Sequence, residues 1–343
     1  MKIIIDAMGG DNAPKSNVQG AVDAQKEFGI EIVLVGNEAE ISACLAECGA
    51  KDDPHISVVN ADEIIDMHDD PATAVRRKKN SSMAMALDLL RTGEGDAVIS
   101  AGSTGALLTG ATLLVKRIRG IRRAAMAPVL PNGGCGTVLI DCGANVECTA
   151  EYLLQFAYMG SFYSKKMLGC ENPRVGLLNN GSEDTKGTPL CKEAYALLKE
   201  ASDAGRLNFI GNVEGTDVFS NKVDVIVTDG YSGNILLKTV EGTAKFMMKN
   251  VREILMKSPK TKLGALLIKK DLYGLKKLMD VSEVGGTAFI GITKPVIKAH
   301  GSSNARAIRS AVKQAIAFVN ADVAADIERN IDYMKLHGDS TEA

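Results

Sequence analysis

The chain opens with Lys2-Ile3-Ile4-Ile5-Asp6-Ala7-Met8-Gly9-Gly10-Asp11-Asn12-Ala13-Pro14, a short apolar run that breaks directly into aspartate, a glycine pair and an Asp-Asn pair. A β-branched run without alternation is typical of a parallel strand covered on both faces, and Pro14 suits the first turn of a following helix. In such sheets, ligands bind at the carboxyl ends of the strands. Gly9 and Gly10 let backbone N–H groups approach an anion, while Asp11 and Asn12 can cap the helix or contact a ligand. An ordinary strand-to-helix turn uses the same residues, so this loop alone leaves both interpretations open.

Further apolar runs that are typical of strands recur at residues 31–35, 56–60, 96–100, 137–141, 174–179, 207–211, 223–228, 287–290 and 295–298. Stretches that are typical of helices separate most of them, at residues 14–28, 106–117, 151–168 and 303–328. Because strands and helices alternate, the sequence predicts a three-layer α/β/α, Rossmann-like architecture with a mostly parallel or mixed sheet. We expect a single unit over residues 1–335, with a protruding helical arm at 245–280 and a flexible tail at 336–343.

The composition limits the class of protein. Apolar residues make up 45% of the 343 positions and charged residues 24%, as in a globular protein. The formal net charge of −2 argues against a general nucleic-acid binder, because such binding needs a broad cationic surface. The seven cysteines form no Cys-x-x-Cys pair, and we interpret them as reduced thiols of a cytoplasmic protein without a metal. Asp6 interrupts the first apolar run, and no run approaches the ~20 apolar residues of a membrane span, so neither a signal peptide nor a transmembrane helix is expected.

The ends of several predicted strands share one chemistry. Glycine stands beside small hydrogen-bonding side chains at residues 100–105, 141–145, 179–184, 228–234 and 300–304. Glycine removes the Cβ barrier, and the N-termini of the following helices offer N–H donors, so together these ends can form an anion-binding cleft. The pattern predicts a phosphate as the ligand.

Several common catalytic motifs do not occur in the sequence. Residues 181–188 resemble a nucleotide P-loop, but their lysine and glycine stand in the wrong order. No Gly-x-Gly-x-x-Gly follows a strand, and neither Gly-x-Ser-x-Gly nor His-Glu-x-x-His occurs. We therefore expect direct group transfer, without a dinucleotide or other cofactor and without a covalent intermediate on the enzyme.

Further short motifs follow the opening stretch and are distributed over nearly the whole chain. After Asp6 to Pro14 they are Ala74-Val75-Arg76 through Ser81-Ser82-Met83, Ser100-Ala101-Gly102 with Thr104-Gly105-Ala106-Leu107, Gly143-Ala144-Asn145-Val146, Pro173-Arg174-Val175-Gly176-Leu177-Leu178-Asn179, Lys186-Gly187, Gly211-Asn212-Val213-Glu214-Gly215, Asp229-Gly230, Gly233-Asn234 and Lys298-Ala299-His300-Gly301. Together these motifs resemble the PlsX family, the phosphate acyltransferases of bacterial phospholipid synthesis that depend on acyl carrier protein. The chain departs from that pattern at Ser103, where many relatives carry Asn, and at Asn180-Gly181-Ser182, where Ile-Gly-Glu is more usual.

The resemblance implies a function, a fold and partners. The function is transfer of a long-chain acyl group from acyl carrier protein to inorganic phosphate, which gives acyl phosphate for a downstream, membrane-bound glycerol-3-phosphate acyltransferase. The fold is that of the isocitrate dehydrogenase and phosphotransacetylase group, and the assembly is a homodimer. Two other functions stay open: a phosphotransacylase of the same fold that uses coenzyme A thioesters, and a non-catalytic, membrane-associated scaffold.

Phosphate is already nucleophilic at neutral pH, so the site should mainly position it against a thioester carbonyl. We expect phosphate and substrate to be bound by residues of four strand ends, namely Asp6, Gly9, Gly10, Asn12, Gly102, Ser103, Thr104, Gly105, Asp229 and Ser302. The catalytic candidates are Asn145 and Asn234 as donors to the oxyanion, and His300 with Lys298 to stabilise the departing thiolate. His300 can equally cap or pack, and Asp11 should order the glycine loop, because its charge would repel phosphate.

Charged and apolar patches suggest contacts with other molecules. The basic clusters that include Arg76, Lys78 and Lys79, and Arg122 and Arg123, suit an acidic carrier protein, although solvated helix faces or phosphate contacts explain them as well.

Residues 263–279 carry an apolar stripe opposite several lysines, and Leu267, Ile268, Leu272 and Leu275 lie on it. This pattern is typical of a helix that lies on an anionic membrane surface, at the inner face of the cell membrane, and dimer packing is the alternative explanation.

Overall fold

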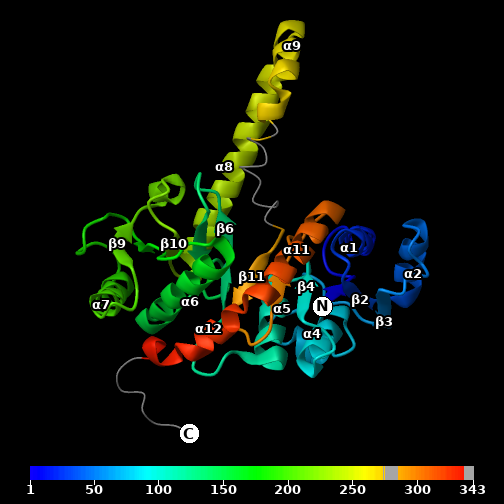
Figure 1. The fold of residues 1–343 in the computed structure, drawn as a ribbon, viewed down its shortest axis with the longest axis horizontal. Coiled ribbons are helices and arrows are strands. Elements are labelled where there is room, and N and C mark those ends of the chain that lie inside the picture. The colour runs from blue at the N-terminus through cyan, green and yellow to red at the C-terminus, as the bar shows by residue number, and fades with distance from the viewer. Residues whose placement is uncertain (273, 275–284, 336–343) are drawn as a thin grey trace.

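The computed structural model describes residues 1–272, 274 and 285–335, and its described strands form two sheets (Figure 1). The seven-stranded sheet has the order β3 (Ile56–Asn60), β2 (Glu31–Gly36), β1 (Lys2–Asp6), β4 (Ala97–Ser100), β12 (Val296–Lys298), β11 (Thr287–Ile290) and β5 (Ala125–Ala127). The five-stranded sheet has the order β6 (Val129–Leu130), β7 (Thr137–Ile140), β10 (Val225–Val227), β8 (Val175–Leu178) and β9 (Phe209–Val213).

Most strand pairs are parallel, as the sequence predicts. The antiparallel pairs in the described sheets are β11 with β12, β11 with β5, and β6 with β7. All nine later runs predicted as strands form strands, whereas β5 and β6 were not predicted. These two strands are only three and two residues long, too short to form a recognisable pattern. Pro128 separates them, so the chain passes there from one sheet to the other.

Register brings three polar residues to one edge of the larger sheet. Strand β1 lies between β2 and β4, and Ile3, Ile4 and Ile5 are at most 1% exposed. Strand β12 pairs in parallel with β4, which sets Lys298 opposite Ser100. Asp6 ends β1, so Asp6, Ser100 and Lys298 all lie where neighbouring parallel strands end.

The helices that cover the larger sheet are α1 (Lys15–Phe28), α2 (Glu38–Glu47), α3 (Ala74–Arg77), α4 (Ser82–Thr92), α5 (Thr104–Gly110) and α11 (Ala305–Ala321). Helices α1 and α11 pack tightly, because a Cβ on Gly20 would lie only 2.5 Å from the Ala305 carbonyl oxygen. A π-helical turn, Ala111–Lys116, continues α5. The helix predicted at 303–328 is divided into α11 and α12 (Val323–Arg329) by Asp322, whose φ is +47°.

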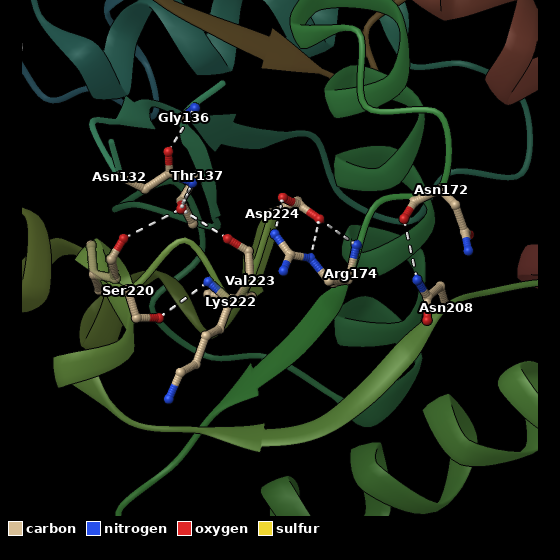
Figure 2. A network of polar contacts seen from close by, with 11 residues as sticks. Asn132, Gly136, Thr137, Asn172, Arg174, Asn208, Ser220, Lys222, Val223 and Asp224 are labelled. Atoms are coloured by element: carbon tan, nitrogen blue, oxygen red, sulfur yellow. Dashed lines mark hydrogen bonds and ion pairs between the residues drawn. The ribbon is translucent and has the colours of Figure 1, made fainter. Parts of the chain in front are cut away.

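The smaller sheet packs against α6 (Ala150–Leu168) and α7 (Pro189–Asp203), and a polar network fixes its entry into β7 (Figure 2). Thr137 donates its hydroxyl to the carbonyl oxygens of Val218, at 3.3 Å, and Val223, at 3.0 Å. Nearby, the Arg174 guanidinium donates to both carboxylate oxygens of Asp224, at 2.8 and 2.9 Å. A bidentate pair of this kind holds β8 and β10 in register.

A helical arm projects from the body of the molecule (Figure 1). Its stem is α8 (Gly230–Met256), and α9 (Pro259–Leu267) folds back against it. The stem therefore begins inside the predicted site, well before the predicted arm boundary at residue 245. Leu275 and the predicted tail at 336–343 lie outside the described residues. In the described part of the chain, no helix is long and apolar enough to cross a membrane.

Candidate functional site

A cavity of about 760 Å³ is lined by residues from both sheets. The smaller sheet contributes Cys142 and Gly143, which follow β7, and the β5–β6 connection contributes Pro128. One face of α8 forms a wall, and the end of β12, the loop 299–304 and the first turn of α11 form another. Of the residues predicted for the site, Lys298, His300, Ser302, Asn234 and Thr104 line this cavity.

The glycine loop after β1 supports the site and does not line the cavity. Ser100 donates its hydroxyl to Asp6 Oδ2 at 2.6 Å, and the Met8 N–H donates to Asp6 Oδ1 at 3.3 Å. The Gly102 N–H, predicted to bind phosphate, donates to Ser100 Oγ at 3.1 Å. Burial raises the pKa of Asp6, and these hydrogen bonds oppose the rise. A Cβ on Gly9 would lie 2.7 Å from Asp6 Oδ2 and 2.7 Å from the Gly102 nitrogen. This glycine therefore allows the ends of β1 and β4 to pack closely.

Asp11 and Asn12 join the loop after β1 to the loop after β12. The Asp11 N–H donates to the Gly301 carbonyl oxygen at 2.8 Å. Asn12 Nδ2 donates to the carbonyl oxygens of Ser302, at 3.2 Å, and Ser303, at 3.1 Å. Gly10 has a φ of +96°, and a Cβ there would come within 2.9 Å of Gly301. The opening loop thus holds in place the segment that lines the cavity.

Lys298 is a buried cation in the wall of the cavity, with 8% of the residue exposed. Its Nζ donates to the carbonyl oxygens of Ala101, at 3.3 Å, and Ala299. Burial lowers the pKa of Lys298 to about 8, although the negative charges of Asp6 and Asp11 oppose that change. Lys298 therefore changes its charge near neutral pH, as a group that moves protons must.

His300 lies at the exposed surface of the cavity in a fixed orientation. The Ser302 N–H donates to His300 Nδ1 at 3.2 Å, and Ser302 Oγ lies 2.9 Å from the same nitrogen. Because Nδ1 accepts, the neutral ring carries its proton on Nε2. Burial and the nearby Lys238 lower the pKa of His300, so the imidazole is neutral at pH 7. The site thus offers an Nε2–H donor.

Asn145 and Asp229 hold the backbone at the other side of the cavity. Asn145 Nδ2 donates to the Ala124 carbonyl oxygen at 2.8 Å and to Asp141 Oδ2 at 3.1 Å, so both of its amide protons have partners. Asp229 caps α8, since its carboxylate accepts from the Ser232 N–H at 2.8 Å and from the Ser232 hydroxyl at 2.9 Å. Asn234 lies one turn further along α8 and lines the cavity.

Ser103 and Gly105 belong to the start of α5. Ser103 Oγ accepts from the Ala106 N–H at 3.5 Å and caps the helix. A Cβ on Gly105 would lie 2.8 Å from Pro71, so this glycine lets the loop before α3 pack onto the helix. Thr104, between them, is the residue of this turn that lines the cavity.

The cavity also contains residues that the sequence analysis missed. Lys238, Glu241 and Arg306 line it, and Lys238 donates to Glu241 at 2.9 Å. Lys238 and Glu241 follow Asn234 on α8 by four and seven residues, which is the sequence signal for one helix face, whereas Arg306 belongs to α11. Ser303 also lines the cavity, and its buried hydroxyl has no hydrogen-bond partner among the described residues. Because it lines the cavity, this hydroxyl can form a hydrogen bond with a ligand there.

Cys142 is buried at the cavity, where its thiol donates to the Gly233 carbonyl oxygen at 3.2 Å. Burial and the neighbouring Asp141 raise the pKa of Cys142 well above its ordinary range. The thiol is therefore protonated and unsuited to nucleophilic attack.

The two predicted docking clusters differ in how they are held. Lys78 Nζ donates to Asp69 at 2.6 Å and to the Ile64 carbonyl oxygen at 2.9 Å. Arg122 pairs with Glu151 at 2.9 Å. The Arg123 guanidinium lies 5.5 Å from the centre of the Tyr152 ring. Arg76 and Lys79 of the first cluster are exposed.

The fold is that of a phosphotransacetylase-like α/β protein. A phosphotransacetylase from Streptococcus pyogenes superimposes with a TM-score of 0.62 at 19% identity, over 95% of this chain and 94% of that one. A branched-chain phosphotransacylase from Enterococcus faecalis V583 gives a TM-score of 0.57 at 15% identity, over 93% of this chain and 99% of that one. At these identities the likeness establishes the fold.

The sequence identifies the family. Residues 1–326 match the family model described as "Fatty acid synthesis protein", and the chain belongs to that family. Relatives named phosphate acyltransferase include those of Oceanobacillus iheyensis, 48% identical over 97% of this chain and 98% of its own, and Clostridioides difficile, 47% identical over 96% of each chain.

Proposed function

We propose that this protein transfers a long-chain acyl group from acyl carrier protein to inorganic phosphate, forming acyl phosphate for phospholipid synthesis. The names of its relatives and its family support acyl transfer to phosphate. The observation that carries the proposal is one cavity that combines a buried lysine, an oriented neutral imidazole and a helix face that bears the apolar side chains Leu237, Ala244 and Met248. An acyl thioester and an anionic acceptor need these three features together.

In this proposal the acceptor phosphate lies between Lys298 and the first turn of α11. The Ser302 and Ser303 hydroxyls line this part of the cavity, and Arg306 adds positive charge. Helix N-termini favour anions, and a cation in a partly buried site attracts phosphate more strongly than one in water. The glycine loop after β1 acts indirectly, because Asn12 fixes the carbonyl groups of Ser302 and Ser303.

The chemical step requires no covalent enzyme intermediate. A phosphate oxygen attacks the thioester carbonyl carbon, the new carbon–oxygen bond forms, the carbon–sulfur bond breaks, and the departing thiolate takes a proton. In this step Asn234 and His300 Nε2–H, which both belong to residues of the cavity wall, donate hydrogen bonds to the oxygen that gains charge. Lys298, with its pKa of about 8, is matched to protonate a thiolate, whose own pKa is usually about 8.5.

The proposal includes partners and a place in the cell. An acidic carrier protein docks at the exposed Arg76 and Lys79 of the first basic cluster. The enzyme forms a homodimer in the cytoplasm and touches the inner face of the cell membrane through α9, where Leu263, Leu266 and Leu267 are each more than half exposed. There it delivers acyl phosphate to the membrane-bound glycerol-3-phosphate acyltransferase.

A comparison of acyl donors tests the function. Purified enzyme is given palmitoyl-acyl carrier protein or palmitoyl-coenzyme A, with and without phosphate, and free thiol is measured. We expect phosphate-dependent thiol release that is at least tenfold faster from the carrier protein. A preference for coenzyme A would favour the phosphotransacylase alternative. Absence of phosphate-dependent release from either donor would contradict enzymatic acyl transfer and leave the scaffold.

A further inference from the structure

One face of α8 carries a stripe that the catalytic groups do not explain. Leu237, Glu241, Ala244 and Met248 all line the cavity, and their spacing of three or four residues sets them on one side of the helix. Leu237 is buried, and the other three residues are half-buried. By contrast, Phe246, on another face of the same stem, is 65% exposed. The stripe is thus a covered surface on an otherwise exposed helix.

Three members of the stripe are apolar, and the charged side chains of Lys238 and Lys245 line the cavity beside them on the same helix. Leu237, Ala244 and Met248 are hydrophobic, and the carboxylate of Glu241 is paired with Lys238 at 2.9 Å. Near its start, Leu237 packs in one cluster with Cys142 and Met126, so the apolar wall is continuous with the β5–β6 side of the cavity.

The stripe begins at the catalytic groups and leads away from them. Asn234 lies one turn before Leu237 and shares the cavity with His300 and Lys298. At 1.5 Å per residue, the distance along α8 from Asn234 to Met248 is about 21 Å. An extended apolar tail whose head group lies beside Asn234 would therefore follow the stripe.

We propose that this stripe binds the acyl chain of the donor and that Ala244 determines which chain lengths are accepted. This inference rests on the proposed acyl transfer. Ala244 is the smallest side chain of the stripe and lies between Leu237 and Met248, so it leaves room for a chain to pass toward the arm. A larger side chain at this position blocks the distal part. Each methylene that loses its apolar contact lowers transfer about fourfold, which corresponds to about 0.8 kcal/mol.

The test uses the full chain carrying Ala244→Phe, with acyl carrier protein loaded with octanoyl, decanoyl, lauroyl, myristoyl or palmitoyl groups. The measured quantity is kcat/KM for phosphate-dependent thiol release. We expect the ratio of palmitoyl to octanoyl transfer to fall at least tenfold relative to the unaltered protein. Ala244→Leu should shift the ratio in the same direction by a smaller factor, and it serves if the phenylalanine variant fails to fold. The matched control is Thr243→Phe, on the exposed side of the same turn, which should leave the ratio unchanged.

An unaltered chain-length ratio in a folded, active Ala244 variant would overturn this inference and leave the proposed function standing, and so would an equal loss with every donor. A ratio that falls as far in Thr243→Phe would overturn it as well. If the unaltered protein releases no thiol in the presence of phosphate, the proposed function fails and this inference fails with it.

Discussion

At the scale of single residues, Lys298 links the structure of the site to pH. The carbonyl groups of Ala101 and Ala299 hold its ammonium group, and its pKa of about 8 lies close to physiological pH. If the protonated form binds phosphate and supplies a proton, kcat/KM for phosphate should fall as pH rises through about 8. Lys298→Arg retains the charge, so its decline should begin at higher pH. The dependence of kcat/KM on pH is measured for both proteins. If kcat/KM declines at the same alkaline pH in the unaltered protein and in Lys298→Arg, the role of Lys298 is contradicted.

The same pKa predicts how stability depends on pH. The pKa of Lys298 is lowered in the folded state from its usual 10.5 to about 8, so between these values the unfolded chain binds more protons. Relative to Lys298→Met, the free energy of unfolding should therefore rise with pH across this window, by about 3 kcal/mol in total. Urea denaturation of both proteins at pH 8 and pH 10 measures the difference. If the free energy of unfolding of the unaltered protein minus that of Lys298→Met stays constant or falls between pH 8 and pH 10, the result would be evidence against a buried, charged lysine.

His300 should affect turnover more than phosphate binding. In His300→Gln, we expect kcat to fall about a hundredfold, because the oriented Nε2–H donor is lost, while KM for phosphate changes less than about twofold. His55→Gln, at an exposed site away from the cavity, is the control. Because burial lowers the pKa of His300, activity should persist at pH 7 and decline on acidification below 6.5. Unchanged turnover in His300→Gln would remove this residue from the mechanism.

At the scale of elements, the start of α8 depends on contact with the end of β7. A Cβ on Gly233 would lie 2.0 Å from the Asp141 carbonyl oxygen, whereas one on Gly242, two turns further along, would have no heavy atom within 4 Å. Gly233→Ala should therefore destabilise the protein by about 3 kcal/mol and reduce transfer, since it displaces Asn234. Gly242→Ala should stabilise α8 by about 1 kcal/mol. Urea denaturation distinguishes the two, and changes of the same sign would contradict this packing.

Much of the element pattern was predictable from the sequence, because buried parallel strands are continuous apolar runs. The loops between them were harder to interpret. The glycines after β1 were predicted to approach phosphate, yet Gly9 and Gly10 allow close contact with Gly102 and Gly301. Asn12 contacts Ser302, which is 290 residues away in the chain, and no local pattern encodes such a pairing. Residues of the α8 wall were missed because their spacing has meaning only once the helix faces a cavity.

At the scale of the whole molecule, the arm gives a test of membrane contact. Leu267, at the end of α9, is 80% exposed. Leu267→Glu should reduce the fraction of protein that sediments with anionic vesicles at least threefold, because it removes apolar contact and adds a negative charge. Lys199→Gln, on α7, makes the same change in net charge and should have little effect. A changed oligomeric state with unchanged vesicle binding would assign this surface to the dimer instead.

The stem of the arm and the wall of the cavity are the same helix. Helix α8 is 27 residues long and joins Asn234, in the wall of the cavity, to the segment that carries α9. If the cavity binds an acyl chain as proposed, a ligand that binds the arm and shifts this helix would also change the affinity of the cavity for that chain. Thermodynamic linkage makes the effect reciprocal, so the chain must alter binding at the arm by the same factor. Under that linkage, loading with an acyl donor would itself regulate where the protein resides.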